Sequence, residues 1–291
     1  MAFCTDDPNL LDDWLTVGAA AQLQGRTSGQ PLETSLLGES LRLWRAEDGT
    51  PVCQSSATEL PVREHCGYLW VCCRGPARKP LFAFPQYQEP GRRRVDCGGI
   101  GVATSGLRVI ENFLDMGHFP YVHIGTLGKV PHTEVLPYKV QVDALNDEIL
   151  ATGCQFYQPR TSATAQQGVQ AQYRYRVMQP LCAALYKSSP VQPGGQDVIV
   201  LMVQPLGEEQ VIAHSLLVYH DDGLADTGMI SFQQTIFGED KPLLESQRPR
   251  RLPLDGPLEA HMRGDLSSAT YRRWLKARGM RFGVHHDTLG T

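Results

Sequence analysis

The chain of 291 residues has no excess of positive charge and no long hydrophobic run. Its 27 Lys and Arg residues are outnumbered by 31 Asp and Glu residues, so no basic surface is indicated for nucleic acid or anionic lipid. The longest apolar runs, at 67–73 and 198–203, are far shorter than the roughly 20 residues that cross a bilayer. The segment around Asp6 and Asp7 is acidic where a secretory signal would be basic. We therefore expect a soluble, cytoplasmic protein with no nucleic-acid or membrane partner.

The cysteines lack the spacing of a zinc or iron-sulfur motif. No Cys-x-x-Cys pair occurs, and no cysteine is followed by histidine at two or three positions. A zinc ribbon and a ferredoxin pattern are therefore absent from the sequence. We expect reduced, mostly buried thiols at all eight positions. These positions are Cys4, Cys53, Cys66, Cys72, Cys73, Cys97, Cys154 and Cys182.

The order of strand-like and helical segments predicts an α+β fold. Short alternating runs at 41–45 and 68–71, separated by turn residues, indicate a small β domain. Proline, glycine and arginine accumulate at 77–94, which favours a linker or a long surface segment there. The remaining strand-like runs surround two or three helical stretches and follow one another without βαβ alternation. They lie at 138–142, 172–177, 197–203 and 211–219. We therefore expect two domains, at 1–97 and 98–291.

The segment 111–123 carries the residues most typical of a chemical site. Three polar side chains follow one another at intervals of three, which would form one ridge on a helix. They belong to Asn112, Asp115 and His118. Because Pro120 disfavours a helical conformation in the residue before it, we expect the helix to end there and His123 to turn back toward His118. Two histidines and one carboxylate on one face of Fe(II) form the oxygen-activating arrangement of non-haem iron enzymes. Two unrelated histidines near a helix end remain the alternative.

This string closely resembles the signature of the Rieske non-haem iron oxygenases, Asn-x-x-Asp-x-x-His-x-x-x-x-His, followed by a loop similar to 125–128. The resemblance is closest to the branch that oxidatively demethylates aromatic and heteroaromatic compounds. In that branch the carboxylate ligand lies in a motif similar to 239–247 of this chain. The resemblance implies that Asp240 is the third iron ligand. It also implies that Asp115 bonds His118 and carries electrons to the iron.

Other carboxylates offer weaker alternatives for the third ligand. Glu239 and Glu245 are close in sequence, but only Asp240 aligns with the carboxylate ligand of the family. The acidic pair 221–222 follows a histidine in a glycine-containing loop, and 285–287 reads His-His-Asp. We expect both segments to be solvated.

The resemblance covers nearly the whole chain but has one gap. Segments at 36–49 and 60–71 are similar to the strands of the family's Rieske domain, and 267–275 is similar to its C-terminal helix. Between Val52 and Glu59 the family carries a longer segment with Cys-x-His and Cys-x-x-His, the ligands of a [2Fe-2S] cluster. That segment is missing from this sequence. The resemblance therefore implies a remnant antiparallel β domain without its [2Fe-2S] loops, followed by a helix-grip catalytic domain with a curved antiparallel sheet.

The missing cluster motif decides which partners we expect. Electrons would have to come from a separate reductase that carries an additional Rieske [2Fe-2S] centre and draws on NAD(P)H. Family members usually form trimers, so we expect a trimer or a hetero-oligomer, with a structural subunit as a candidate cover for the deleted region.

The truncation also bears on the substrate that we expect. The missing cluster segment makes this chain similar to the cluster-lacking N-demethylase subunits of bacterial caffeine breakdown. This resemblance implies O2-dependent N-demethylation of a methylxanthine, best matched by conversion of 7-methylxanthine to xanthine and formaldehyde. The alternatives are a monooxygenase or O-demethylase on another aromatic compound, and a catalytically silent scaffold.

Substrate contacts are predicted from a helix expected at 231–237. Gln233 and Phe237 are four residues apart and share one face of it, on roughly the same side as the ligand Asp240. They would offer an amide to a xanthine and an apolar wall, and we add Asn112 from the polar ridge. An exposed Gln233 and a core Phe237 remain the alternative. We also expect Pro242 to kink the chain just beyond this helix.

Overall fold

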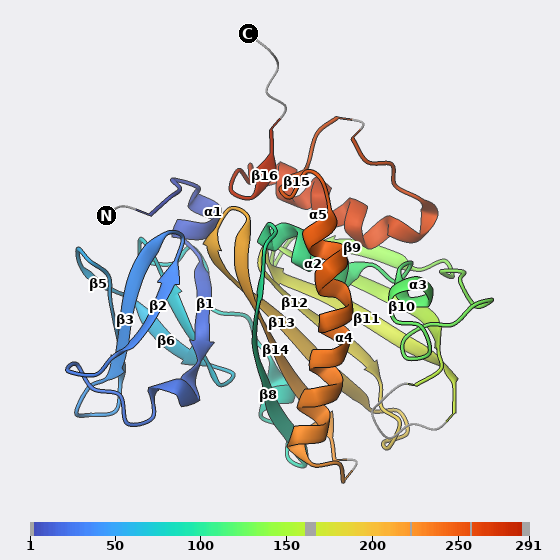
Figure 1. The fold of residues 1–291 in the computed structure, drawn as a ribbon, viewed down its shortest axis with the longest axis horizontal. Coiled ribbons are helices and arrows are strands. Elements are labelled where there is room, and N and C mark those ends of the chain that lie inside the picture. Colours follow the sequence, from blue (N-terminus) through green and yellow to red (C-terminus); the bar gives the residue numbers. More distant parts are fainter. Residues whose placement is uncertain (1–2, 161–166, 222, 257, 287–291) are drawn as a thin grey trace.

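The computed structural model describes residues 3–160, 167–221, 223–256 and 258–286. In Figure 1 a small group of strands from the N-terminal part lies beside a larger sheet, and helices cover one face of that sheet. None of the helices in the described part of the chain combines the length and hydropathy that a bilayer crossing needs.

The small N-terminal unit contains two antiparallel sheets. The first has the strand order β1-β7-β6, and its strands are β1 (Trp14–Ala19), β6 (Val62–His65) and β7 (Tyr68–Cys72). The second has the order β2-β3-β4-β5, and its strands are β2 (Leu32–Leu36), β3 (Glu39–Arg45), β4 (Pro51–Gln54) and β5 (Glu59–Leu60). Three short helices accompany them, namely α1 (Pro8–Leu11), η1 (Ala20–Leu23) and η2 (Pro85–Tyr87).

The large unit is built on one seven-stranded antiparallel sheet with the order β8-β14-β13-β12-β11-β10-β9. Its strands are β8 (Arg92–Val102), β9 (Lys139–Asp143), β10 (Glu148–Gln158), β11 (Val169–Gln179), β12 (Cys182–Ser188), β13 (Gln196–Gly207) and β14 (Gln210–His220). The helical elements are α2 (Gly106–Leu114), α3 (Phe119–Val122), α4 (Asp226–Ser246), η3 (Arg263–Asp265) and α5 (Leu266–Ala277). A short parallel pair, β15 (Leu252–Pro253) and β16 (Val284–His285), completes the unit. The expected α+β class is confirmed.

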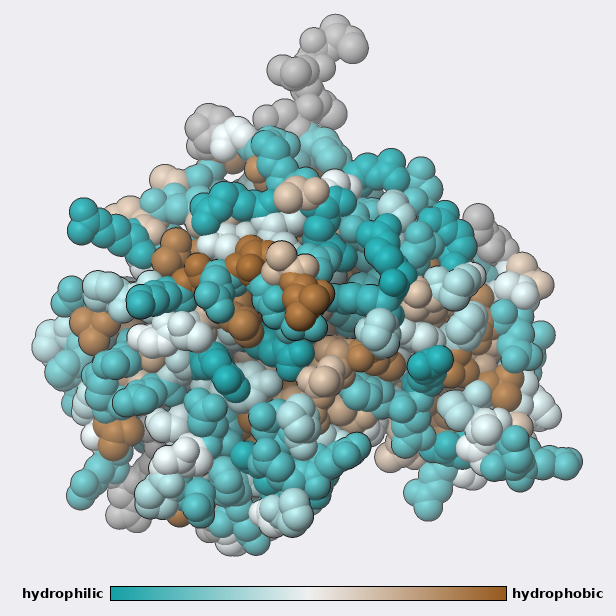
Figure 2. All heavy atoms as spheres, turned by 180° about the vertical axis from the view of Figure 1, so that it is seen from behind, coloured by the Kyte–Doolittle hydropathy of each residue, from teal (hydrophilic) through white to brown (hydrophobic). Residues whose placement is uncertain are grey.

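The central strands of the large sheet are buried on both faces. On β13, Leu201 and Val203 pack in the core that includes side chains of α2, α4 and α5. The alternate residues Val200 and Met202 pack in a second core with Trp70 of the small unit. A strand that is covered on both faces is apolar at nearly every position, which explains the continuous run at 198–203. On the side turned away from the viewer in Figure 1, hydrophobic side chains gather in a band across a mostly hydrophilic surface (Figure 2).

The linker or surface segment expected at 77–94 ends earlier than predicted, because its last residues belong to a strand. β8 begins at Arg92, which pairs with His220 of β14. The arginines that suggested a linker extend from the strand, and the Arg92 guanidinium donates to the carbonyl of Gln196 at 2.6 Å. The expected boundary after Cys97 falls inside β8. We keep the division into two parts as a proposal, with a junction before β8.

A largely buried cluster of four charged side chains ties the helices to the C-terminal segment. Arg108 of α2 donates to Glu259 at 2.6 and 3.0 Å and lies 3.5 Å from Glu111. Arg272 of α5 pairs with both glutamates. Arg108, Glu111 and Arg272 are all buried. Glu259 is partly exposed, whereas the other three charges have left water, so their burial is tolerable only because they are paired.

We predict that Arg272→Ala lowers the free energy of unfolding by about 3 kcal/mol, because it leaves buried carboxylates with one cation fewer. Lys276→Ala, one turn further along α5, is the matched control. Lys276 and its partner Asp255 are both mostly exposed, so this change should lower the same free energy by less than about 1 kcal/mol. Urea titration followed by circular dichroism measures both. Equal effects of the two substitutions would contradict a structural role for the cluster.

The cluster also predicts a pH dependence of stability. Burial raises the pKa of Glu259, but the guanidinium groups of Arg108 and Arg272 outweigh it and lower the pKa to about 2. In the unfolded chain a glutamate titrates at about 4.3, so the stabilisation is complete above that pH and is lost as pH falls toward 2. Wild type should exceed Glu259→Gln in unfolding free energy at pH 7, and the difference should shrink between pH 4.5 and 2. A difference that stays constant in urea titrations across this range would refute the assignment.

Candidate metal centre

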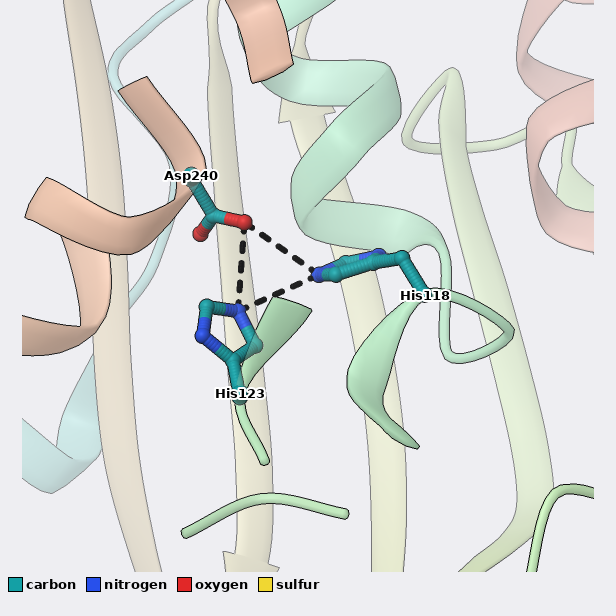
Figure 3. A group of neighbouring side chains, drawn as sticks. All are labelled: His118, His123 and Asp240. Carbon is teal, nitrogen blue, oxygen red and sulfur yellow. Dashed lines mark hydrogen bonds and ion pairs between the residues drawn. The ribbon is translucent and has the colours of Figure 1, made fainter. Parts of the chain in front are cut away.

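Three side chains from two distant parts of the chain meet at one point. His118 and His123 flank the short helix α3, and Asp240 lies on α4 (Figure 3). The two Nε2 atoms are 3.3 Å apart. The Asp240 Oδ1 atom lies 3.3 Å from Nε2 of His118 and 3.1 Å from Nε2 of His123. Within the described ranges, these residues form the one group of three or more side chains that could hold a metal ion.

The local structure that brings the histidines together differs from the expected single helix. α2 ends at Leu114, and Asp115 forms its C-cap. The Asp115 carboxylate accepts the backbone N–H groups of Gly117 at 2.8 Å and His118 at 3.2 Å, which turns the chain away from the helix axis. Pro120 does not end a helix but lies in the first turn of α3, a position where its fixed φ favours helix formation. The histidines converge because two helices meet at this turn.

Each imidazole is oriented by a second carboxylate. Nδ1 of His118 lies 2.9 Å from Oδ2 of Asp115, as the resemblance implied. Nδ1 of His123 lies 2.7 Å from Oε2 of Glu239, the residue next to Asp240. A proton on each Nδ1 leaves the lone pair on each Nε2, and both lone pairs then face Asp240. Sequence reasoning considered Glu239 only as an alternative ligand, although its place next to Asp240 in one helix was a usable signal.

The arrangement fits a divalent cation. With a proton on each Nδ1, the two Nε2 atoms and the carboxylate oxygen are all acceptors, so the buried Oδ1 of Asp240 faces the two rings without a donor. His123 is 1% exposed, so water does not replace the missing donor. Two atoms that bind one ion at right angles, each about 2.1 Å from it, lie about 3 Å apart. The three observed separations of 3.1 to 3.3 Å match this geometry.

The electrostatics of the site also favour a cation. Burial lowers the pKa of His118, but the carboxylates of Asp115 and Asp240 outweigh burial and raise the pKa to about 9. Burial raises the pKa of Asp240, but the close approach of the two imidazole rings outweighs burial and lowers the pKa to about 2. Both directions mean that positive charge is stabilised between these side chains.

A cavity opens next to the three side chains. Its empty volume is about 770 Å³ with the open mouth included. Its floor is formed by alternate residues of the large sheet, and its walls come from α2 and α4. The predicted residues Asn112, Gln233 and Phe237 all line it. The expected helix at 231–237 is part of α4, which continues through Pro242.

Glu245 and Asp221, two further carboxylates considered from the sequence, do not reach this site. Glu245 accepts the backbone N–H of Ala103 at 2.9 Å, and Asp221 pairs with Arg93 at the surface. Asp222 and Asp287 lie outside the described residues. Ligation by Asp240 is therefore the alternative that the geometry favours.

The small unit carries no cluster-binding group in the residues that the structure describes. All eight cysteines are free, and the six at Cys53, Cys72, Cys73, Cys97, Cys154 and Cys182 are buried. Burial raises the pKa of Cys53 to about 12, which disfavours the thiolate that a metal requires. The described part of the chain therefore offers one metal site, in the large unit.

Comparison with known proteins places this geometry in a family. The family model of the vanillate O-demethylase oxygenase C-terminal domain matches residues 102–280. The probable methylxanthine N7-demethylase NdmC of Pseudomonas sp. (strain TJI-51) is 43% identical over 277 residues, which cover 94% of this chain and 96% of that protein. Methylxanthine N1-demethylase NdmA of Pseudomonas putida is 27% identical over 166 residues, which cover 57% of this chain and 45% of NdmA.

Two solved structures share the fold. NdmA of Pseudomonas putida CBB5 with caffeine has a TM-score of 0.75 at 20% identity, with 94% of this chain and 92% of that chain covered. Dicamba monooxygenase bound to 3,6-dichlorosalicylic acid has a TM-score of 0.72 at 17% identity, with 94% and 99% covered. At these identities the likeness concerns the fold alone.

We predict that Glu239→Gln weakens Fe(II) binding by roughly 10- to 100-fold, because the neutral amide no longer fixes the orientation and basicity of His123. His123→Ala, which removes a ligand, should abolish stoichiometric binding. Glu245→Gln is the matched control on the same helix and should bind as wild type does. Anaerobic equilibrium dialysis against Fe(II) measures all three. Wild-type affinity in Glu239→Gln would show that this carboxylate has no role at the metal.

Proposed function

The chain belongs to the family of Rieske-type oxygenases with the vanillate O-demethylase oxygenase C-terminal domain, and on this basis we propose that it is an O2-dependent methylxanthine N-demethylase. The substrate that we propose is 7-methylxanthine, converted to xanthine and formaldehyde. The observation that carries this proposal is the 43% identity to NdmC over 94% of the chain, together with the convergent His118, His123 and Asp240.

The residues of this chain have separate tasks in the proposed reaction. His118, His123 and Asp240 would hold ferrous iron, which supplies O2 activation for hydroxylation of an N-methyl carbon. Asp115 and Glu239 keep the two imidazoles in the tautomer that leaves Nε2 free. The apolar cavity walls hold the substrate next to the metal and exclude water. The hydroxylated methyl group then leaves as formaldehyde. Overall, O2, two electrons and two protons convert the N-methyl group to N–H, formaldehyde and water.

The two electrons would come from a separate protein. We propose a reductase with an additional Rieske [2Fe-2S] centre that draws on NAD(P)H, since the described part of the small unit has no cluster-binding group. The Asp115 side chain is 28% exposed and bonds His118, so it connects the solvent side to the metal. Tyr121, Ile124 and Val130, which follow in the chain, are large and exposed. Such apolar exposure close to an electron entry point supports docking of a partner or of a neighbouring copy in a trimer.

The experiment combines the iron-loaded protein, a Rieske-type reductase, NAD(P)H and 7-methylxanthine in air. We expect formaldehyde and xanthine in equal amounts, and no product when the reductase is left out. Theobromine, caffeine and an O-methylated aromatic acid serve as competing substrates. Iron-loaded protein that converts no methylxanthine with a competent reductase would refute the proposal, and conversion of the aromatic acid alone would favour an O-demethylase.

We predict that Asp115→Asn keeps its iron but lowers the turnover rate by about 10-fold or more, because the neutral amide disturbs the contact with His118 and the electron path. Asp143→Asn, at an exposed hairpin of β9 and β10, is the control for loss of one surface charge. Iron content and single-turnover kinetics separate metal loss from slow reduction. Wild-type rates in Asp115→Asn would remove this residue from the electron path.

A further inference from the structure

Two neighbouring tyrosines on the cavity floor have hydroxyl groups without a partner. Tyr173 and Tyr175 lie on β11 and, being two residues apart, point to the same face of the sheet. They are 3% and 1% exposed, and both line the cavity beside the metal centre. Their ring centroids are 6.2 Å apart with an interplanar angle of 32°. Neither hydroxyl forms a hydrogen bond.

Two other tyrosine hydroxyls in the described part of the chain do have partners. The hydroxyl of Tyr271, which is equally buried, donates to the carbonyl of Pro180 at 2.6 Å. The hydroxyl of Tyr138 donates to the carbonyl of Gly264 at 2.8 Å. A buried hydroxyl without a partner destabilises the folded state, and phenylalanine would fill the same space without that penalty. Two such hydroxyls side by side in one cavity indicate that their partner is a bound molecule.

The pair lies next to the place where chemistry occurs. Tyr173 packs against Phe119 with a centroid distance of 6.5 Å, and Phe119 packs against His118 at 4.9 Å. Tyr175 packs against Phe113 of α2 at 6.0 Å. One aromatic ring therefore separates Tyr173 from a proposed metal ligand. A molecule that contacts both hydroxyls lies within the same cavity as the metal centre.

Another unpartnered polar atom of the cavity lining, on Gln158, lies too far away to belong to the same recognition unit. Oε1 of Gln158 is also buried without a partner. Gln158 is four residues along β10 from Cys154, the residue that pairs with Tyr173. At about 3.4 Å per residue this places it about 14 Å along the strand, too far to bond the same atoms of a small ligand. The two tyrosines therefore form the recognition unit.

We propose that Tyr173 and Tyr175 donate hydrogen bonds to two carbonyl oxygens of the substrate and so select a heterocycle with a pyrimidinedione ring. This inference rests on the proposed function, because it specifies which part of a methylxanthine the cavity recognises. In a xanthine the two carbonyls, at C2 and C6, flank a single ring nitrogen, so adjacent donors match adjacent acceptors. Burial raises the pKa of both phenols well above the ordinary value, so both remain protonated and act as donors at neutral pH.

The first experiment measures binding and stability in the same variants. Tyr173→Phe and Tyr175→Phe, each loaded with iron and kept anaerobic, are titrated with 7-methylxanthine in a calorimeter. We expect the dissociation constant to rise about 5- to 10-fold in each, as for one lost hydrogen bond. The melting temperature without ligand should stay unchanged or rise, because an unsatisfied hydroxyl has been removed.

Tyr271→Phe is the matched control, since its hydroxyl has a partner in the protein and lies outside the cavity lining. It should lower the melting temperature and leave 7-methylxanthine binding unchanged. A structural role of Tyr173 and Tyr175 would give this same pattern in their variants, and that result would overturn the proposal.

A second ligand tests which atoms are recognised. 7-Methylhypoxanthine keeps the C6 carbonyl but has hydrogen at C2, so one tyrosine should lose its partner. For that tyrosine, the Phe variant and wild type should bind 7-methylhypoxanthine equally, while the other variant keeps its 5- to 10-fold effect. Variants that bind 7-methylxanthine within twofold of wild type would overturn the inference alone, provided wild type still demethylates it. Wild type that neither binds nor demethylates any methylxanthine would overturn the proposed function as well.

Discussion

Three hydrogen-bond acceptors that face one another in a nearly dry space dominate the structure of this protein. Without a positive charge between them, the Nε2 atoms of His118 and His123 and the Oδ1 of Asp240 would repel. Their convergence is maintained from outside by Asp115 and Glu239, which bond the far side of each ring. The three side chains are held together by the turn after α2, the short helix α3 and the long helix α4. The fold therefore holds three acceptor atoms close together, and a divalent ion bound between them would relieve their repulsion.

The convergence of His118, His123 and Asp240 could be expected because the strings at 111–123 and 239–247 resemble the signature of a known family. The spacing of the two histidines alone left two unrelated side chains as the alternative. The local backbone was not predictable from the same spacing. A period of three is typical of a helix, but the Asp115 side chain competes for backbone N–H groups and ends α2. The spacing of the side chains predicted a helix through His118, but the hydrogen bonds from the main chain to the Asp115 carboxylate end that helix at Leu114.

The runs expected to be strand-like all overlap with strands, but β10 and β12 of the large sheet were not predicted. A second weakness lay at the start of β8, where several arginines suggested a linker. An arginine side chain can extend to the surface from a strand as well as from a linker, so this residue type does not distinguish the two. The roles of Tyr173 and Tyr175 illustrate a deeper limit. Alternation along β11 indicates that both side chains face one side of the sheet. Whether their hydroxyl groups find partners depends on all the strands and helices that line the cavity, namely β10 to β14 and α2 to α4. That the hydroxyl groups of Tyr173 and Tyr175 lack partners can therefore be seen only in the folded structure.

The two-sided burial of β13 gives the small N-terminal unit a purpose that does not depend on redox chemistry. One set of its side chains, including Leu201, lines the cavity, while the neighbouring set, including Val200 and Met202, rests on Trp70 of that unit. Removal of the unit would expose an apolar face of the sheet directly behind the cavity. The small unit therefore supports the cavity from behind, although its described residues offer no cluster-binding group.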